Sequence, residues 1–230
     1  MALEFPADVE PLLFPEQLVV LHDGRILNQR ELFLAISRHL KNPSFLHGLA
    51  RSLDNNEATV MLHDGRCLNK RALLMEALRF SPDSSPLLHD LARTLLCNKM
   101  VTLHNGRIFG QRELLLEALK FSPNNATLLH DLARSLSWEE TVILEGEQSH
   151  NRKQLLVEAF RFSPDNAAVL LDLADSLDGD DVVLHDGRVL NGRELCVMAL
   201  HINTNFAMAY YRLGRMLAGR IRCFTSWSHS

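Results

Sequence analysis

Residues 182–195 form the sequence VVLHDGRVLNGREL, and four related stretches occupy residues 19–32, 60–73, 101–114 and 142–155. Their leucines Leu21, Leu62, Leu103, Leu144 and Leu184 stand 41, 41, 41 and 40 residues apart. A second block, EALRFSPDSSPLLHDLARTL at 76–95, recurs in similar form at 117–136 and 158–177. Self-similarity at a fixed period is typical of solenoids, in which each unit packs mainly on its neighbours. The sequence therefore predicts one array of about five repeats.

Each repeat contains a predicted β-hairpin. Asp186-Gly187 separates two short runs rich in β-branched residues. This pattern favours a type I′ turn, which needs positive φ at both central residues. Asp23-Gly24, Asp64-Gly65 and Asn105-Gly106 repeat the pattern, whereas the fourth repeat departs from it with Glu145-Gly146 and a polar second strand. Two strands span about the 8–10 Å between packed helices, so we expect neighbouring hairpins to pair edge to edge.

Two helices separate successive hairpins. The helix after the hairpin begins with a capping box at Asn28/Glu31, Asn151/Gln154 and Asn191/Glu194, while Asn69 lacks the acidic partner. It ends before a proline, because the residue preceding proline is pushed out of the α region. These prolines are Pro43, Pro82, Pro123 and Pro164. The next helix, as at 127–136, has the spacing of a buried apolar stripe. We expect the recurring Phe80, Phe121 and Phe162 to lie in the core.

The helical part resembles the tetratricopeptide repeat. In the last repeat, AYYRLGR at 209–215 matches the family's large aromatic, leucine and glycine positions with Tyr210, Leu213 and Gly214. The family repeat has about 34 residues, and the extra length here falls between its first and second helices, where the hairpin fits. The resemblance implies a mainly α fold, a right-handed α-α superhelix with a short β-hairpin inserted in each repeat of about 41 residues.

The predicted organisation has three parts. Residues 1–17 are unlike the repeats and are expected to form an N-terminal cap. Residues 18–218 form the array, with repeats starting near 18, 59, 100, 141 and 181. The last helix is expected to end near Ala218, and residues 219–230 form a C-terminal tail.

Composition excludes several classes of function. The chain is 47% hydrophobic and 23% charged, with a net charge of −4. This balance argues against nucleic-acid binding. No apolar run approaches the roughly 20 residues of a membrane-spanning helix. The four cysteines, Cys67, Cys97, Cys196 and Cys223, lack paired spacing, and the first residues do not form a signal peptide. We therefore expect a cytoplasmic protein with free thiols.

The sequence contains no recognisable catalytic motif. The histidines recur once per repeat rather than at the spacing of a zinc site. No nucleophile with a matching base stands outside the repeat pattern. We therefore expect no enzymatic activity, no metal, no cofactor and no small-molecule substrate, and we assign the repeated His-Asp dipeptides to the scaffold.

Candidate binding residues form a ladder on the family's first helices. The residue after the aromatic position and the residue four further on share a helix face, and the resemblance implies that this face lines a peptide-binding groove. The ladder consists of His47, Arg51, His89, Arg93, His130, Arg134, Asp175, Tyr211 and Arg215. Arginine forks suit carboxylates, so we expect a protein or peptide partner of acidic character. Asp175 interrupts the positive charge.

Three interpretations of the ladder stay open. The arginines could pair internally with Asp90, Asp131 and Asp172, or some could pair while others line a groove, or they could form a dedicated anion clamp. The hairpin arginines Arg25, Arg66, Arg107 and Arg188 are expected to contact the turn aspartate or solvent. The predicted function is a non-catalytic protein-interaction scaffold. The alternative is a structural subunit or spacer of a larger assembly, with no free ligand.

Overall fold

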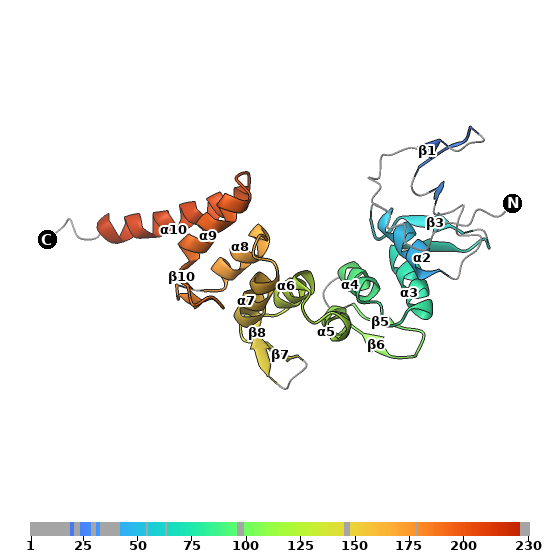
Figure 1. Ribbon diagram of the computed structural model, residues 1–230, viewed down its shortest axis with the longest axis horizontal. Coiled ribbons are helices and arrows are strands. Elements are labelled where there is room, and N and C mark those ends of the chain that lie inside the picture. Colours follow the sequence, from blue (N-terminus) through green and yellow to red (C-terminus); the bar gives the residue numbers. More distant parts are fainter. Residues whose placement is uncertain are drawn as a thin grey trace. The chain divides into compact units, whose positions relative to one another are not determined.

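The computed structural model describes residues 19–20, 24–28, 31–32, 42–53, 55–62, 64–95, 99–144, 148–177 and 179–225. This part of the chain is mainly helical, with small two-stranded hairpins (Figure 1). The chain divides into two compact units, Met1–Phe121 and Ser122–Ser230, which we treat separately. The expected cap at residues 1–17 lies outside the described residues.

Unit 1 contains hairpins alternating with helices. Its elements are β1 (Val19–Val20), β2 (Ile26–Leu27), α2 (Pro43–Arg51), β3 (Thr59–Met61), β4 (Cys67–Asn69), α3 (Lys70–Phe80), α4 (Ser85–Thr94), β5 (Val101–Thr102), β6 (Ile108–Phe109) and α5 (Gln111–Phe121). Helix α2 packs against α3 and α4 against α5, while α3 also packs against α4. One repeat is therefore a first helix, a hairpin and a second helix, as in α2, β3–β4 and α3.

Unit 2 continues the same order. Its elements are α6 (Ala126–Arg134), β7 (Thr141–Ile143), β8 (Ser149–Asn151), α7 (Arg152–Phe162), α8 (Ala167–Asp175), β9 (Val182–Val183), β10 (Val189–Leu190), α9 (Gly192–Ile202) and α10 (Ala207–Thr225). The first helices α6 and α8 pack against the second helices α7 and α9, and α10 packs against α9. Helix α10 extends to Thr225, beyond the end expected near Ala218.

The hairpins have a three-residue loop, so the predicted type I′ turn is wrong. The Leu103 N–H donates to the Arg107 carbonyl at 2.9 Å, and the Gly106 N–H donates to the Leu103 carbonyl at 2.9 Å. Three residues, ending in Gly106 at φ +77°, therefore lie between the closing pair. This is the loop of a tight turn followed by a left-handed glycine. The same two bonds recur at 62–66 and 184–188, and the predicted positive φ at the turn glycine is confirmed.

The aspartate of the loop holds the arginine that follows it. Asp64 Oδ1 accepts from the Arg66 backbone N–H at 3.0 Å, and Asp64 Oδ2 accepts from Arg66 Nε at 2.6 Å. Asp186 and Arg188 repeat both contacts. The expectation that these arginines contact the turn aspartate is thus confirmed for Arg66 and Arg188. The contacts explain why Asp-Gly-Arg recurs as a unit.

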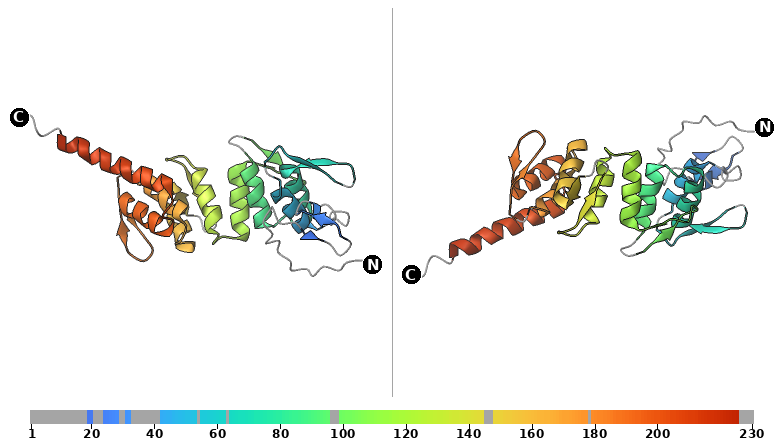
Figure 2. Two further views of the ribbon diagram at one scale, coloured as in Figure 1. Left: turned by 90° about the horizontal axis from the view of Figure 1, so that it is seen from above. Right: turned by 90° about the horizontal axis from the view of Figure 1, so that it is seen from below.

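Each hairpin forms a separate two-stranded sheet in the described residues of its unit. The prediction that neighbouring hairpins pair edge to edge is therefore wrong. Figure 2 shows the hairpin β3–β4 projecting away from its helices. In the fourth repeat Val142 pairs with His150, so the strands form there despite the polar sequence. The short strands need no neighbouring hairpin, because each is joined covalently to the helices on either side.

Helix ends follow the capping pattern. The capping boxes at Asn28/Glu31, Asn151/Gln154 and Asn191/Glu194 are present, and Asn69 caps without a reciprocal partner. Helices α3, α5 and α7 end two residues before their prolines, as predicted. The helix preceding Pro43 lies outside the described residues.

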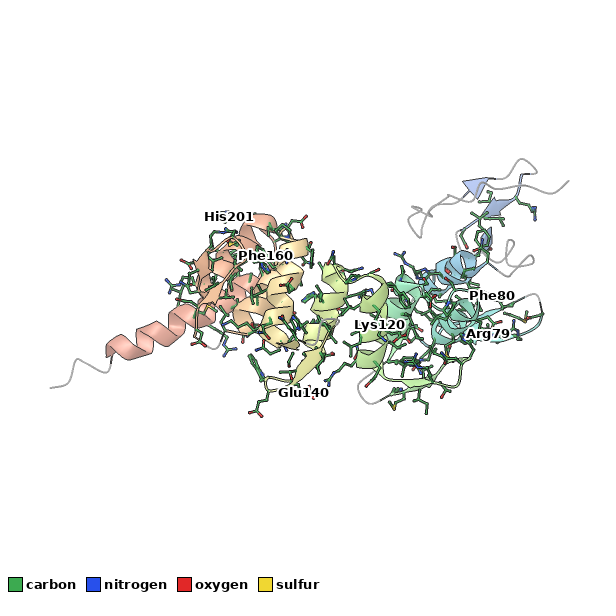
Figure 3. All side chains as sticks on the ribbon, turned by 60° about the horizontal axis from the view of Figure 1, so that its bottom comes forward. Arg79, Phe80, Lys120, Glu140, Phe160 and His201 are labelled. Carbon is green, nitrogen blue, oxygen red and sulfur yellow. The ribbon has the colours of Figure 1, made fainter. Side chains whose placement is uncertain are left out.

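Leucines and alanines form the core, but the three repeated phenylalanines do not. Leu73, Leu74 and Ala77 of α3 are fully buried. Phe80, Phe121 and Phe162 are about 40% exposed, so their predicted core position is wrong. Phe80 stands next to the exposed Arg79 at the end of α3 (Figure 3). It continues the apolar stripe of the helix, but as the last helical residue it lies where no neighbouring element fully covers it.

Candidate functional site

The structure places the nine ladder residues on the first helices of both units. In unit 1, His47 and Arg51 lie on α2, and His89 and Arg93 lie on α4. In unit 2 the remaining residues are His130 and Arg134 on α6, Asp175 on α8, and Tyr211 and Arg215 on α10. Each histidine is thus one helical turn before an arginine, as the sequence predicts.

In unit 1 a histidine–aspartate pair connects two first helices. His47 Nε2 lies 2.7 Å from Asp90 Oδ2, joining α2 to α4. The two side chains are 19% and 24% exposed, so the pair is partly shielded from water. It joins neighbouring repeats rather than the two helices of one repeat. The contact therefore holds successive first helices in register.

In unit 2 the same contact recurs. His130 Nε2 lies 2.7 Å from Asp172 Oδ2, joining α6 to α8, and His130 is only 8% exposed. Because both pairs have the same geometry, we interpret them as one repeated element of the array, which we call the His–Asp strut. His47 and His130 serve as struts and are mostly covered, so they present little of the surface that a peptide would contact.

The aspartates of the struts are ionised carboxylates. Burial acts to raise the pKa of Asp90, but the hydrogen bond from His47 and the attraction of nearby cationic side chains outweigh it, so the pKa is lowered. For Asp172, burial again acts to raise the pKa, and His130 and Arg134 bring it below the ordinary value. An ionised carboxylate only accepts hydrogen bonds. The Nε2 of each histidine must therefore donate the proton.

The arginines one turn later remain on the surface. Arg51, Arg93, Arg134 and Arg215 are exposed residues. Arg134 is 63% exposed, and its Nε lies 3.8 Å from Asp172 Oδ2, far longer than the contact from His130. The histidine thus takes the close position on the carboxylate. The guanidinium group of Arg134 stays available to solvent and to a ligand.

Asp175 is held by a different arginine. Arg212 Nη2 on α10 lies 2.7 Å from Asp175 Oδ2 on α8. Burial raises the pKa of Asp175 above its ordinary value, although Arg212 acts in the opposite direction. Leu171 stands at the strut position of α8 and is buried. An arginine–aspartate bridge therefore replaces the His–Asp strut between these two helices, and the positive row is interrupted there.

The last members of the ladder form an exposed aromatic and cationic pair. The guanidinium carbon of Arg215 lies 6.0 Å from the ring centroid of Tyr211, at the outer limit of a cation–π contact. Tyr211 is 59% exposed. This end of the ladder combines an apolar ring with a positive charge.

The sequence singled out the ladder but missed the struts. The His-Asp dipeptide was assigned to the scaffold, and the structure shows that its two residues act in opposite directions along the array. Asp90 and Asp172 accept from the histidine of the preceding repeat, and His130 donates to the following one. The signal was present as a spacing of 42 or 43 residues between partners.

Two further properties bear on chemistry. Across the described ranges, no three histidine, cysteine, aspartate or glutamate side chains gather in a group that could hold a metal ion. A search of these same ranges also finds no helix with the length and apolar character needed to cross a bilayer.

Comparison with known proteins leaves the family open. No protein-family model and no curated protein matches the chain. The tetratricopeptide resemblance therefore stays a prediction carried by the residues quoted above, beside the observed succession of helix, hairpin and helix.

Proposed function

We propose that the chain is a non-catalytic scaffold that binds an acidic protein segment on the arginine face of its first helices. This face consists of Arg51, Arg93 and Arg134, with Tyr211 and Arg215 toward the C-terminal end. The resemblance to tetratricopeptide arrays adds the proposal that the repeats form a right-handed superhelix whose groove holds the partner.

The observation that carries the proposal is the division of labour between histidine and arginine. A buried aspartate beside an arginine would ordinarily neutralise it. Here the histidine occupies the carboxylate at 2.7 Å, while Arg134 stays 63% exposed at 3.8 Å. The charge of the arginine is therefore not fully used by the fold. A carboxylate of a partner can form the closer, forked contact that Asp172 does not.

Binding through this face has a measurable salt dependence. Exposed charge pairs are screened over roughly 8 Å at physiological ionic strength. The affinity for an acidic peptide should therefore fall as salt rises. A partner held by the apolar hairpin surfaces would bind with little salt dependence.

The test measures anisotropy of fluorescein-labelled dodecapeptides rich in Asp and Glu, with Lys-rich dodecapeptides for comparison. The variant replaces Arg51, Arg93 and Arg134 by Gln. The matched control makes the same change of charge at Arg79, Lys120 and Arg161, exposed at the ends of second helices.

We expect the chain to prefer the acidic peptides and the ladder variant to bind them at least about ten-fold more weakly, since charge-assisted bonds contribute about 1.5–3 kcal/mol each when fully formed. The control variant should bind like the parent. Equal weakening in both variants would indicate a general charge effect and contradict the proposal. So would a ladder variant that melts far below the parent, because the arginines would then be structural.

A further inference from the structure

Helix α10 carries an apolar stripe that the described residues leave open. Tyr210, Gly214 and Leu217 stand at positions i, i+4 and i+7 and so share one helix face. Tyr210 is 57% exposed and Leu217 is 50% exposed. A Cβ atom built on Gly214 would meet no heavy atom within 4 Å. The opposite side of the helix is packed, since Ala209 is fully buried.

The same stripe is covered in every other described first helix. The residues equivalent to Leu217 are Leu53, Leu95, Leu136 and Leu177, none more than 3% exposed. The residues equivalent to Tyr210 are Leu46, Leu88, Leu129 and Leu170, none more than 2% exposed. Each of these helices packs against the second helix that follows its hairpin. Helix α10 is therefore a half-repeat with the surface of a helix that expects a second helix.

The N-terminal part of the chain supplies the complementary half. The hairpin β1–β2 is followed by a capping box, in which Asn28 and Glu31 exchange hydrogen bonds, as at the start of other second helices. The next residue, Leu32, is only partly buried. Its equivalents in the other second helices, Leu73, Leu114, Leu155 and Leu195, are completely buried. A second-helix half is thus incompletely covered at this position.

We propose that these two halves join between copies of the chain. The stripe of α10 in one copy receives the hairpin β1–β2 and the helix that begins at Glu31 of a second copy. The occupant is argued from the chain itself, because the same kind of half-repeat covers the same kind of stripe four times within it. Residues 19–32 are also nearly identical in sequence to residues 60–73 and 182–195.

This contact is head-to-tail. The two surfaces differ, so joining one pair leaves an open stripe at one end and an open second-helix half at the other. Such an interface does not close on itself and adds further copies in a row. The proposal is independent of the arginine face and stands or falls without it.

The test is sedimentation velocity on the full 230-residue chain, between about 1 and 100 µM, a range suited to micromolar contacts. We expect the mass-average molecular mass to rise beyond that of a dimer. Leu217→Glu should weaken the association about ten- to hundred-fold, because the leucine is buried in the contact. Ile143→Glu is the matched control, since Ile143 is equally exposed but lies on the hairpin β7–β8. It should associate like the parent.

Mixing two variants tests the direction of the contact. Leu217→Glu blocks the stripe, and Leu32→Glu blocks the other half, so each variant alone should be monomeric. Mixed, they should form a heterodimer that grows no further. If circular dichroism shows that Leu32→Glu does not fold, excess Leu217→Glu chain added to the parent replaces this arm. It should cap growth and reduce the parent's assemblies toward dimers.

Three results would overturn the proposal. A parent chain that is monomeric at every concentration would show that a second copy does not cover α10. A folded Leu32→Glu variant that still dimerises would indicate a symmetric contact between two α10 helices. A Leu217→Glu variant that associates as well as the Ile143→Glu control would place the contact elsewhere.

Discussion

The His130–Asp172 strut should contribute about 1–2 kcal/mol to the free energy of unfolding. A hydrogen bond to a charged group contributes about 1.5–3 kcal/mol. The lower half of that range applies here, because Asp172 is 24% exposed and keeps part of its hydration. The perturbation is His130→Leu, which copies the buried Leu171 found at the same position of the next repeat. Leucine fills the site, so the loss measures mainly the missing hydrogen bond.

The assay is a double-mutant cycle with Asp172→Ala, followed by urea unfolding at pH 7. The cycle isolates the coupling between the two side chains from their separate effects. The matched control is the cycle of Arg134→Gln with the same Asp172→Ala, where the long contact of an exposed arginine predicts coupling below about 0.5 kcal/mol. A coupling for His130 no larger than that for Arg134 would refute the assignment of histidine as the partner of the carboxylate.

The strut also predicts a direction of pH dependence. The pKa of Asp172 is lower in the folded chain than its ordinary value of 3.8, with burial opposed and outweighed by His130. Stability from the carboxylate is therefore fully present above pH 3.8 and is lost as the pH falls through the folded pKa. Comparing the acid unfolding of the parent with that of the Asp172→Ala variant measures this loss. An identical acid limb in both would contradict the lowered pKa.

Two further predictions follow from the hairpins, the helices and the cysteines. Gly65→Ala should destabilise the chain by about 1 kcal/mol or more, since Gly65 has φ +82°, whereas Gly214→Ala, in a helix interior with open space at its Cβ, should stabilise it by up to about 1 kcal/mol. Equal urea midpoints for the two variants would contradict the turn geometry. Cys196 is buried and its pKa is raised to about 11 by burial, so at pH 8 a chromogenic disulfide reagent should modify the exposed Cys67 and leave Cys196 unmodified until the chain unfolds. Mass spectrometry of a variant lacking the other two cysteines checks this, and early labelling of Cys196 would show that its helix opens.

Local patterns predicted the repeats, the hairpin positions and the helix caps. These features depend on residues a few positions apart, such as Asn151 and Gln154, whose mutual hydrogen bonds need only one helical turn. The period of 41 residues then repeats the same local problem along the chain. Agreement among independent repeats made the succession of elements legible from sequence.

Features that depend on distant partners were not predictable in the same way. The loop length is decided by which pair closes the hairpin, Leu103 and Arg107, and Asn-Gly alone does not specify it. Phe80 lies on the apolar stripe by spacing, but its exposure depends on what reaches the end of α3. His47 and Asp90 meet only because neighbouring first helices pack in one register. Each miss concerns packing between elements rather than the elements themselves.

The most direct test of the proposed function observes the arginines themselves. Side-chain Nε–Hε signals of arginine are recorded by NMR while an Asp- and Glu-rich dodecapeptide is added to the parent chain. The account predicts shifts for Arg51, Arg93 and Arg134, with Arg79 and Arg161 unchanged, and reversal of the shifts at high salt. Shifts confined to Arg79 and Arg161, or equal in all five, would contradict a binding face on the first helices.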